Sequence, residues 1–170
     1  MSAHATPQPS AAMVAMAHRL ARYPRFSWRS DPAVPPFPDE APLVVFDGVC
    51  VLCSGFARFV ATRDRARTIR FTAAQSPLGQ ALMRHYGLDT RDFETNLLIA
   101  DGQAHAKLEA FAGIMGRLGP PWPLAKVVLA LPRRQRDWLY DRVAQNRYAL
   151  LGKRETCIMP GPEWRDRVLE

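Results

Sequence analysis

The sequence predicts an α/β fold: a small mixed four-stranded sheet in the element order βαβαββα, with extra helices at the C-terminal end. Three features indicate this fold. Residues 43–62 change from an apolar, β-forming run to a helical pattern. A short alternating strand at residues 68–72 follows a helix of only about a dozen residues, which predicts parallel pairing of the two strands. Further on, Asp101-Gly102 between two strand-like runs predicts a hairpin.

The first strand is expected at residues 43–46, where four β-forming residues precede the turn signal Asp47-Gly48. A helix should then begin near Cys50. Its apolar residues recur at three- and four-residue spacing, namely Leu52, Phe56, Phe59 and Val60. The pattern therefore predicts a strand, a tight turn and a helix in direct succession.

The second strand, at residues 68–72, alternates apolar and polar side chains. Ser76 then supplies an N-cap and Pro77 a first-turn proline for the next helix, which Gly87 ends. Its apolar face is formed by Leu78, Ala81, Leu82 and Tyr86.

The other half of the sheet is expected to be a buried strand at residues 96–100 and an edge strand at residues 103–107. A helix over residues 108–118 should follow, with Gly119 as its stop signal. Its apolar stripe consists of Leu108, Phe111, Ala112, Met115 and Leu118.

Two further helices are expected near the C-terminus, a short apolar one at residues 124–131 and the longest one at residues 133–151. Pro132 separates them, and a tail of residues 153–170 follows Gly152. No segment reaches the roughly 18 consecutive apolar residues that a membrane-spanning helix requires. The sequence therefore predicts no integral membrane span.

The N-terminal quarter differs in composition from the rest. Residues 1–42 contain no acidic residue before Asp31 and are rich in proline after it. We expect them to form an arm and a proline-rich linker that is partly disordered. Residues 43–170 are expected to form one folded domain with a C-terminal helical extension.

Composition limits the classes of function. The chain of 170 residues has a formal net charge of +7, but only three of its 23 basic residues are lysines and the arginines are scattered among aspartates. This pattern does not form the basic tract typical of nucleic-acid binding, and no nucleic-acid partner is expected. Three cysteines, an odd number, argue against a disulfide-stapled secreted scaffold and favour a reducing compartment, the cytoplasm.

Cys50 and Cys53 are the strongest candidates for chemistry. Their spacing places both sulfurs on one face of the first helical turn. The N-terminus of a helix carries partial positive charge, which favours a thiolate and lowers the pKa of a cysteine there. We therefore expect Cys50 to be the reactive sulfur and Cys53, one turn deeper, to be a more buried resolving thiol.

Asp47 lies three residues before the first cysteine, at the end of the predicted buried strand. A carboxylate there can take or relay the proton of Cys53 during exchange. It can equally do no more than shape the turn or cap the helix, and the sequence leaves both roles open.

Two separated motifs resemble one known family. Asp47, Cys50 and Cys53 match the DxxCxxC signature of the DCC (Asp-Cys-Cys) thiol-disulfide oxidoreductases, and residues 139–157 resemble that family's distal Y, NRY, G and C pattern. The resemblance covers about residues 42–169. It implies a thioredoxin-like fold and a protein-disulfide reductase type of activity, with Cys50 and Cys53 as the redox pair. Thioredoxins carry a proline just before the third strand, but residues 92–96 contain none.

Arg147, Tyr148 and Cys157 are accessory candidates. Arg147 can stabilise a thiolate and Tyr148 can donate to a bound sulfur, or the helix that carries them is simply clamped to the domain. Cys157 is either a second resolving thiol or a small buried residue.

The exchange reaction requires no metal or organic cofactor. Its expected partners are a protein or small-molecule disulfide as substrate and an external thiol reductant that recycles the pair. The alternatives are a zinc site, of which CxxC is only half, and an interaction module whose cysteines merely pack.

Overall fold

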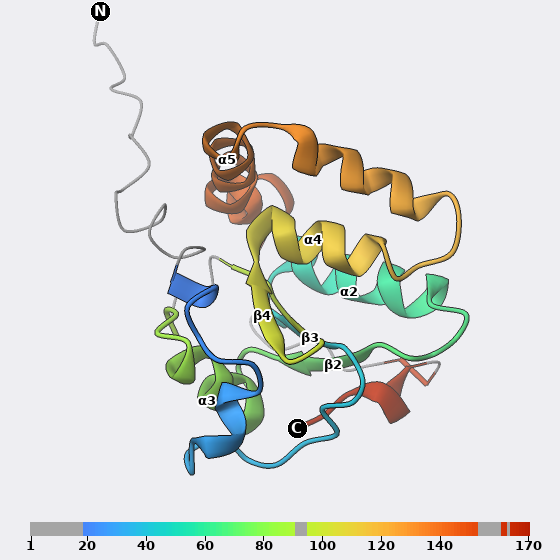
Figure 1. Cartoon of the computed structure of the whole chain (residues 1–170). Helices are drawn as coiled ribbons and strands as arrows, with labels where there is room; N and C mark the ends of the chain where they lie inside the picture. The colour runs from blue at the N-terminus through green and yellow to red at the C-terminus, as the bar shows by residue number, and fades with distance from the viewer. Residues whose placement is uncertain (1–18, 91–94, 153–160, 163) are drawn as a thin grey trace, which may run out of the picture.

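The computed structural model describes residues 19–90, 95–152, 161–162 and 164–170, apart from a few side chains on the last long helix. The elements follow the predicted order (Figure 1). They are β1 (Leu43–Phe46), α2 (Val51–Arg63), β2 (Arg70–Ala73), α3 (Pro77–His85), β3 (Leu97–Ala100), β4 (Gln103–Ala106), α4 (Lys107–Met115), η2 (Trp122–Ala130) and α5 (Arg133–Leu151), with short 3₁₀ helices η1 (Ser27–Ser30) and η3 (Arg165–Arg167).

The sheet has four strands in the order β2-β1-β3-β4. β1 and β2 are parallel, whereas β3 pairs antiparallel with both β1 and β4. Asp101 and Gly102 adopt positive φ angles of 53° and 79°, as a two-residue hairpin turn requires. The predicted α/β fold, the parallel pairing and the hairpin are confirmed, and the arrangement is consistent with a thioredoxin-like fold.

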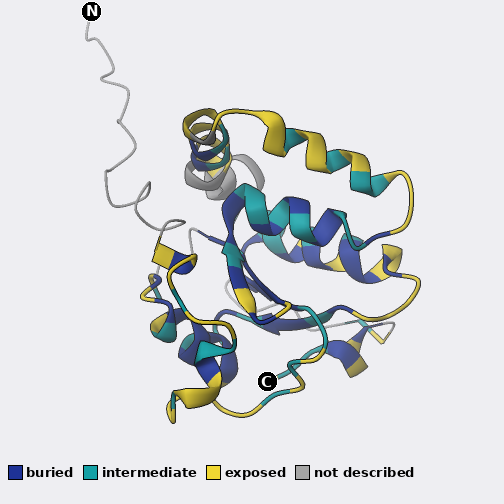
Figure 2. Ribbon diagram, in the orientation of Figure 1, coloured by how far each residue is buried: buried dark blue, intermediate teal, exposed yellow. Residues whose placement is uncertain are grey.

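Helices cover both faces of the sheet, so β1 and β3 are buried along their whole length (Figure 2). Because side chains alternate along β1, Val44 and Phe46 face α2 and α4, while Leu43 and Val45 face α3. The sheet thus separates two hydrophobic clusters. α5 lies outside α2 and α4 as a further layer (Figure 1) and contacts both of them.

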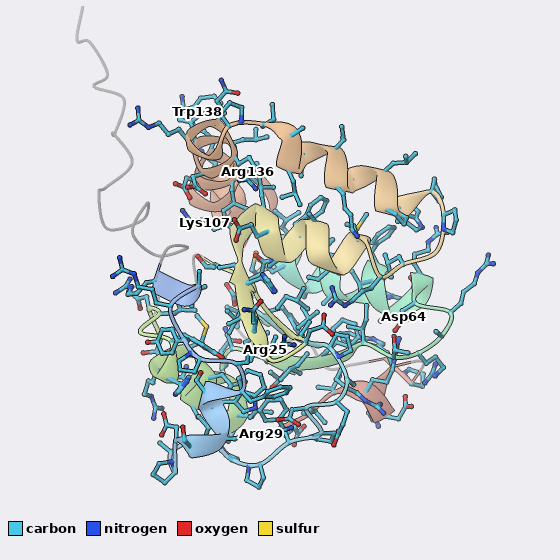
Figure 3. All side chains as sticks on the ribbon, viewed as in Figure 1. Arg25, Arg29, Asp64, Lys107, Arg136 and Trp138 are labelled. Atoms are coloured by element: carbon cyan, nitrogen blue, oxygen red, sulfur yellow. The ribbon has the colours of Figure 1, made fainter. Side chains whose placement is uncertain are left out.

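The described part of the predicted arm packs on the α3 side of the sheet. Leu20, Trp28 and Val34 are buried there. Trp28 Nε1 donates to Asp39 Oδ2 at 2.9 Å, and the Arg29 guanidinium donates to both carboxylate oxygens of Asp39 at 2.8 Å. Figure 3 shows Arg25 and Arg29 on this segment. Residues 19–42 therefore supply part of the core on this side.

The C-terminal segment is fixed to β2. Leu169 N donates to Phe71 O at 2.7 Å, and Val168 forms an isolated parallel bridge with Phe71. Arg167 is fully buried, and its Nη1 donates to Asp64 Oδ2 at 2.8 Å. This buried ion pair joins the end of α2 to the end of the chain.

The strands lie within two residues of their predicted bounds, and two predicted helices differ in more than this. The helix expected at residues 124–131 is the 3₁₀ helix η2, in which Leu124 N bonds to Pro121 O and Leu131 N to Val128 O, three residues back in each case. α4 ends at Met115, three residues before its predicted end, and its last apolar residues continue into a turn. Neither difference changes the layers of the fold.

Candidate active site

The cysteine pair lies where β1 passes into α2. Cys50 is the N-cap of α2, with extended backbone angles (φ −76°, ψ 122°). Its Sγ accepts a hydrogen bond from Cys53 N at 3.3 Å, and its carbonyl accepts from Ser54 Oγ at 2.7 Å. A backbone N–H aimed at a sulfur stabilises its thiolate form. The predicted strand, turn and helix around the pair are therefore confirmed.

The two sulfurs differ in exposure, and the prediction that Cys53 is the more buried of the two is wrong. Cys50 is fully buried, whereas Cys53 is partly exposed; neither is in a disulfide. The reason is the capping geometry, since the Cys50 side chain folds back over the first turn toward the Cys53 N–H. Cys53, at the third helical position, lies in the wall of a cavity between the helices instead.

Asp47 is buried and held in the turn before the pair. Its Oδ1 accepts from Val49 N at 3.1 Å and from Gln75 Nε2 at 2.7 Å. The same Gln75 side chain accepts from Gly48 N at 3.0 Å through Oε1. Asp47 thus shapes the turn, one of the two roles that the sequence left open, and Gln75 clamps the turn from the neighbouring loop.

Gln75 was missed by the sequence analysis. It follows β2, the strand that runs parallel to β1. The carboxyl ends of parallel strands meet at one edge of a sheet, so a polar side chain just past β2 was a usable signal.

The cavity beside Cys53 has a volume of about 370 Å³ and lies between β1, α2, α4 and α5. Its described lining is Val44, Phe46, Leu52, Cys53, Phe56, Asn96, Leu108, Phe111, Leu139, Tyr140 and Val143. Asn96 and Tyr140 are bonded to each other. Tyr140 Oη donates to Asn96 Oδ1 at 2.8 Å and accepts from Asn96 N at 3.3 Å, so α5 is tied to the residue that precedes β3.

A buried ion pair joins α4 to α5 near this cavity. Lys107 Nζ lies 3.1 Å from Asp141 Oδ1, and both side chains are buried. Burial raises the pKa of Asp141, and the charge of Lys107 opposes that rise. Figure 3 shows Lys107 and Arg136 where the two helices meet. The pair holds α5, and with it one wall of the cavity, against the domain.

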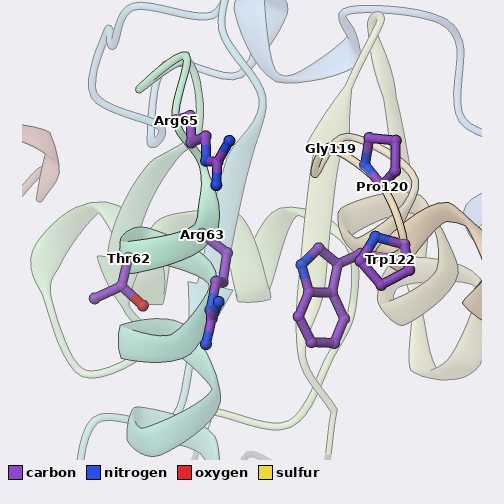
Figure 4. A pocket seen from close by; sticks show the side chains of 7 residues that line it. Thr62, Arg63, Arg65, Gly119, Pro120 and Trp122 are labelled. Atoms are coloured by element: carbon purple, nitrogen blue, oxygen red, sulfur yellow. The ribbon is translucent and has the colours of Figure 1, made fainter.

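A second cavity, also of about 370 Å³, lies at the opposite end of α2 (Figure 4). Arg63 and Arg65 face the loop of Gly119, Pro120 and Trp122 across it. The Arg63 guanidinium carbon is 5.6 Å from the centre of the Trp122 ring, a cation–π distance. The described lining of this cavity contains no cysteine, and the cavity lies at the end of α2 opposite to the cysteine pair.

The accessory candidates are not described: the side chains of Arg147 and Tyr148, and the whole of Cys157, lie outside the described part of the chain. Among the residues that the structure does describe, no three His, Cys, Asp or Glu side chains are grouped so that they could hold a metal ion. Within the same residues, no helix has the length and apolar character needed to cross a membrane.

Comparison with known proteins identifies the family. Residues 44–153 match the model of the DCC1-like thiol-disulfide oxidoreductase family, a span that contains both cysteines. The chain belongs to this family. It is 39% identical over 127 residues to the uncharacterized protein YuxK of Bacillus subtilis (strain 168), covering 75% of this chain and 93% of that protein.

A plant relative is equally similar to this DCC1-like chain. The DCC family protein At1g52590, chloroplastic, of Arabidopsis thaliana is 40% identical over 120 residues, which cover 70% of each protein. No solved structure matches the chain. The predicted family resemblance is confirmed, and the family's description points to a thiol-disulfide oxidoreductase.

Proposed function

We propose that this DCC1-like protein catalyses thiol-disulfide exchange, in the manner of a protein-disulfide reductase, with Cys50 and Cys53 as its redox pair. The observation that carries the proposal is the arrangement of the two sulfurs on α2. Cys50 Sγ accepts the Cys53 N–H at the positive end of the helix, while Cys53 borders an open cavity. One sulfur is thus stabilised as a thiolate, and the other can be reached by a substrate.

Exchange proceeds in two displacements. A thiolate of the pair attacks one sulfur of the substrate disulfide, and the other substrate sulfur leaves as a thiolate. The second cysteine then attacks the mixed disulfide, closing the Cys50–Cys53 bond and releasing the remaining substrate thiolate. The pair loses two electrons and the substrate gains them, and the protons of the two cysteine thiols end on the two substrate thiols.

The difference in exposure between the two cysteines supports a particular order of attack. Cys53 borders the cavity and Cys50 is fully buried, so we assign the first contact with substrate to Cys53 and the resolving step to Cys50. This reverses the order expected from the sequence. The Cys53 N–H contact favours the thiolate form of Cys50, which is the form that attacks in the resolving step.

Asp47 is proposed to relay protons between the pair and solvent. It is a buried carboxylate that precedes Cys50 by three residues, and the Gln75 amide and the Val49 N–H fix its Oδ1. A fixed carboxylate beside a dithiol can accept the proton of whichever cysteine must become the nucleophile.

The test is a trap for the mixed disulfide. Cys50→Ser and Cys53→Ser variants are each incubated with a disulfide substrate, and the adduct is mapped by mass spectrometry. The proposal predicts a persistent adduct on Cys53 in Cys50→Ser and a pair disulfide in the unaltered protein. If an adduct forms on Cys50 in Cys53→Ser and none forms in Cys50→Ser, then Cys50 attacks first, as expected from the sequence. If neither variant forms an adduct and the unaltered protein forms no pair disulfide, exchange at this site is refuted.

The partners follow from the reaction. The substrate is a protein or small-molecule disulfide, and an external thiol reductant returns the oxidised pair to the dithiol form. A reducing compartment supplies such a reductant, and we propose the cytoplasm. The plant relative is named as chloroplastic, and this location describes the plant protein only.

A further inference from the structure

The cavity beside Cys53 is lined mostly by hydrocarbon. Three phenylalanine rings, Phe46, Phe56 and Phe111, come from three different elements, β1, α2 and α4. Leu139 and Val143 from α5 form its lip and are 41% and 48% exposed. These two large apolar side chains face solvent next to a reactive sulfur, which indicates a binding surface rather than ordinary surface variation.

Polar recognition is scarce in this cavity. Among its described lining residues none is charged, and the side chains of Asn96 and Tyr140 hydrogen-bond to each other. A ligand carboxylate placed here would lose its hydration without gaining a cation from any described lining residue, which is costly. Apolar groups meet no such cost.

The cavity's size also limits its ligand. Its volume of about 370 Å³ is near the lower end of small-molecule sites, which span about 300 to 1,000 Å³. A folded protein surface cannot enter such a space, but one or two organic rings can.

We propose that this cavity is the substrate site of the exchange reaction and that it takes the uncharged aromatic or branched aliphatic group of a small organic disulfide. The proposal rests on the exchange function proposed above. With the organic group in the cavity, against Phe56 and Phe111, the disulfide meets Cys53 in the wall. Cys53 sulfur bonds to the seated sulfur, the other substrate sulfur leaves as a thiolate, and Cys50 then displaces the seated group.

A rate comparison tests the preference. Oxidation of the reduced protein is timed with dipyridyl disulfide, which is aromatic and uncharged, and with glutathione disulfide, which is anionic. Each rate is divided by the rate of dithiothreitol with the same disulfide, which removes differences in intrinsic reactivity. The proposal predicts a normalised preference for the aromatic substrate of roughly tenfold or more, the smallest discrimination expected of an apolar pocket. Equal normalised rates, or a preference for glutathione disulfide, would overturn it.

Two matched variants locate the effect. Val143→Asp places a charge at the lip of the cavity, and Val127→Asp places the same charge on η2, where Val127 is 75% exposed and is not in the lining. The normalised preference for the aromatic substrate should fall at least about fivefold in Val143→Asp and should be unchanged in Val127→Asp. Equal loss in both variants would mean that the preference does not arise in this cavity.

A binding measurement separates this proposal from the exchange function. Cys50→Ser/Cys53→Ser cannot exchange, but its cavity should still bind the uncharged fluorophore N-phenylnaphthylamine, and adding Val143→Asp should weaken that binding at least about fivefold. If the probe binds in this way but the unaltered protein exchanges nothing, the redox function fails and the cavity stands. If exchange proceeds but the probe does not bind, the proposed substrate site is refuted.

Discussion

Replacing Arg167 by methionine tests the buried ion pair that closes the fold. Arg167 is fully buried; its Nη1 bonds to Asp64 Oδ2 at 2.8 Å, and its Nη2 donates to Ala61 O. Methionine keeps much of the hydrocarbon but removes the charge, so among the described residues the buried Asp64 carboxylate retains only the Ile69 N–H at 2.8 Å. Breaking a buried pair on one side costs about 3 to 5 kcal/mol. For a chain of this size that lowers the melting temperature by about 6 to 20 °C.

The assay is thermal and urea unfolding, followed by circular dichroism. Arg165→Met is the matched control, because Arg165 is exposed on the same 3₁₀ helix and should change the free energy of unfolding by no more than about 0.5 kcal/mol. Adding Asp64→Asn to Arg167→Met removes the buried carboxylate charge that lacks its arginine, and should recover part of the lost free energy of unfolding. If Arg167→Met costs no more than the control, the ion pair does not hold the C-terminal segment.

Four other substitutions have defined outcomes. Asp47→Asn can still accept the Val49 N–H but cannot take a proton. The exchange rate should therefore fall by roughly 100-fold at pH 6 and recover as the pH rises, while thermal stability stays unchanged. An unchanged dependence of the exchange rate on pH would exclude the relay. The hydrogen bonds from Arg29 hold the pKa of the Asp39 carboxyl below its usual range. The stability that the Asp39 carboxylate gives to the fold is therefore complete above about pH 4 and is lost as the pH falls through the lowered pKa. Asp39→Asn should weaken this dependence of the free energy of unfolding on acid pH, as measured by urea unfolding at a series of pH values. Gly102→Ala should destabilise the fold by about 1 to 3 kcal/mol, because φ is +79° and the new Cβ would lie 2.6 Å from Phe26. Gly55→Ala, in open space on α2, should instead stabilise the fold by about 0.5 to 1 kcal/mol.

Local signals predicted most of the sheet and the position of the cysteine pair. The strand-to-helix change at Asp47 and the hairpin at Asp101 depend on residues within a few positions of each other, which a single sequence reveals. The same holds for Ser76, whose hydroxyl accepts from Gly79 N as an N-cap.

Features that depend on distant residues were missed or misjudged. Arg167 and Asp64 are 103 residues apart, and nothing in the spacing of charges pairs them. The exposure of Cys53 depends on α4 and α5, which leave a cavity beside it, so the helical pattern of α2 alone did not predict which cysteine is the more buried. Gln75 acts through a side chain that crosses to the neighbouring strand end.

The proposed function requires that Cys50 and Cys53 form a reversible disulfide that exchanges with an external thiol. The most direct measurement equilibrates the full chain with glutathione buffers of graded potential, quenches by rapid alkylation, and quantifies the Cys50–Cys53 disulfide by mass mapping. We predict a single two-electron transition that is reached from both the oxidised and the reduced side and is absent in Cys50→Ser. If both cysteines remain thiols at every potential, or form only separate glutathione adducts, the pair is not a redox centre.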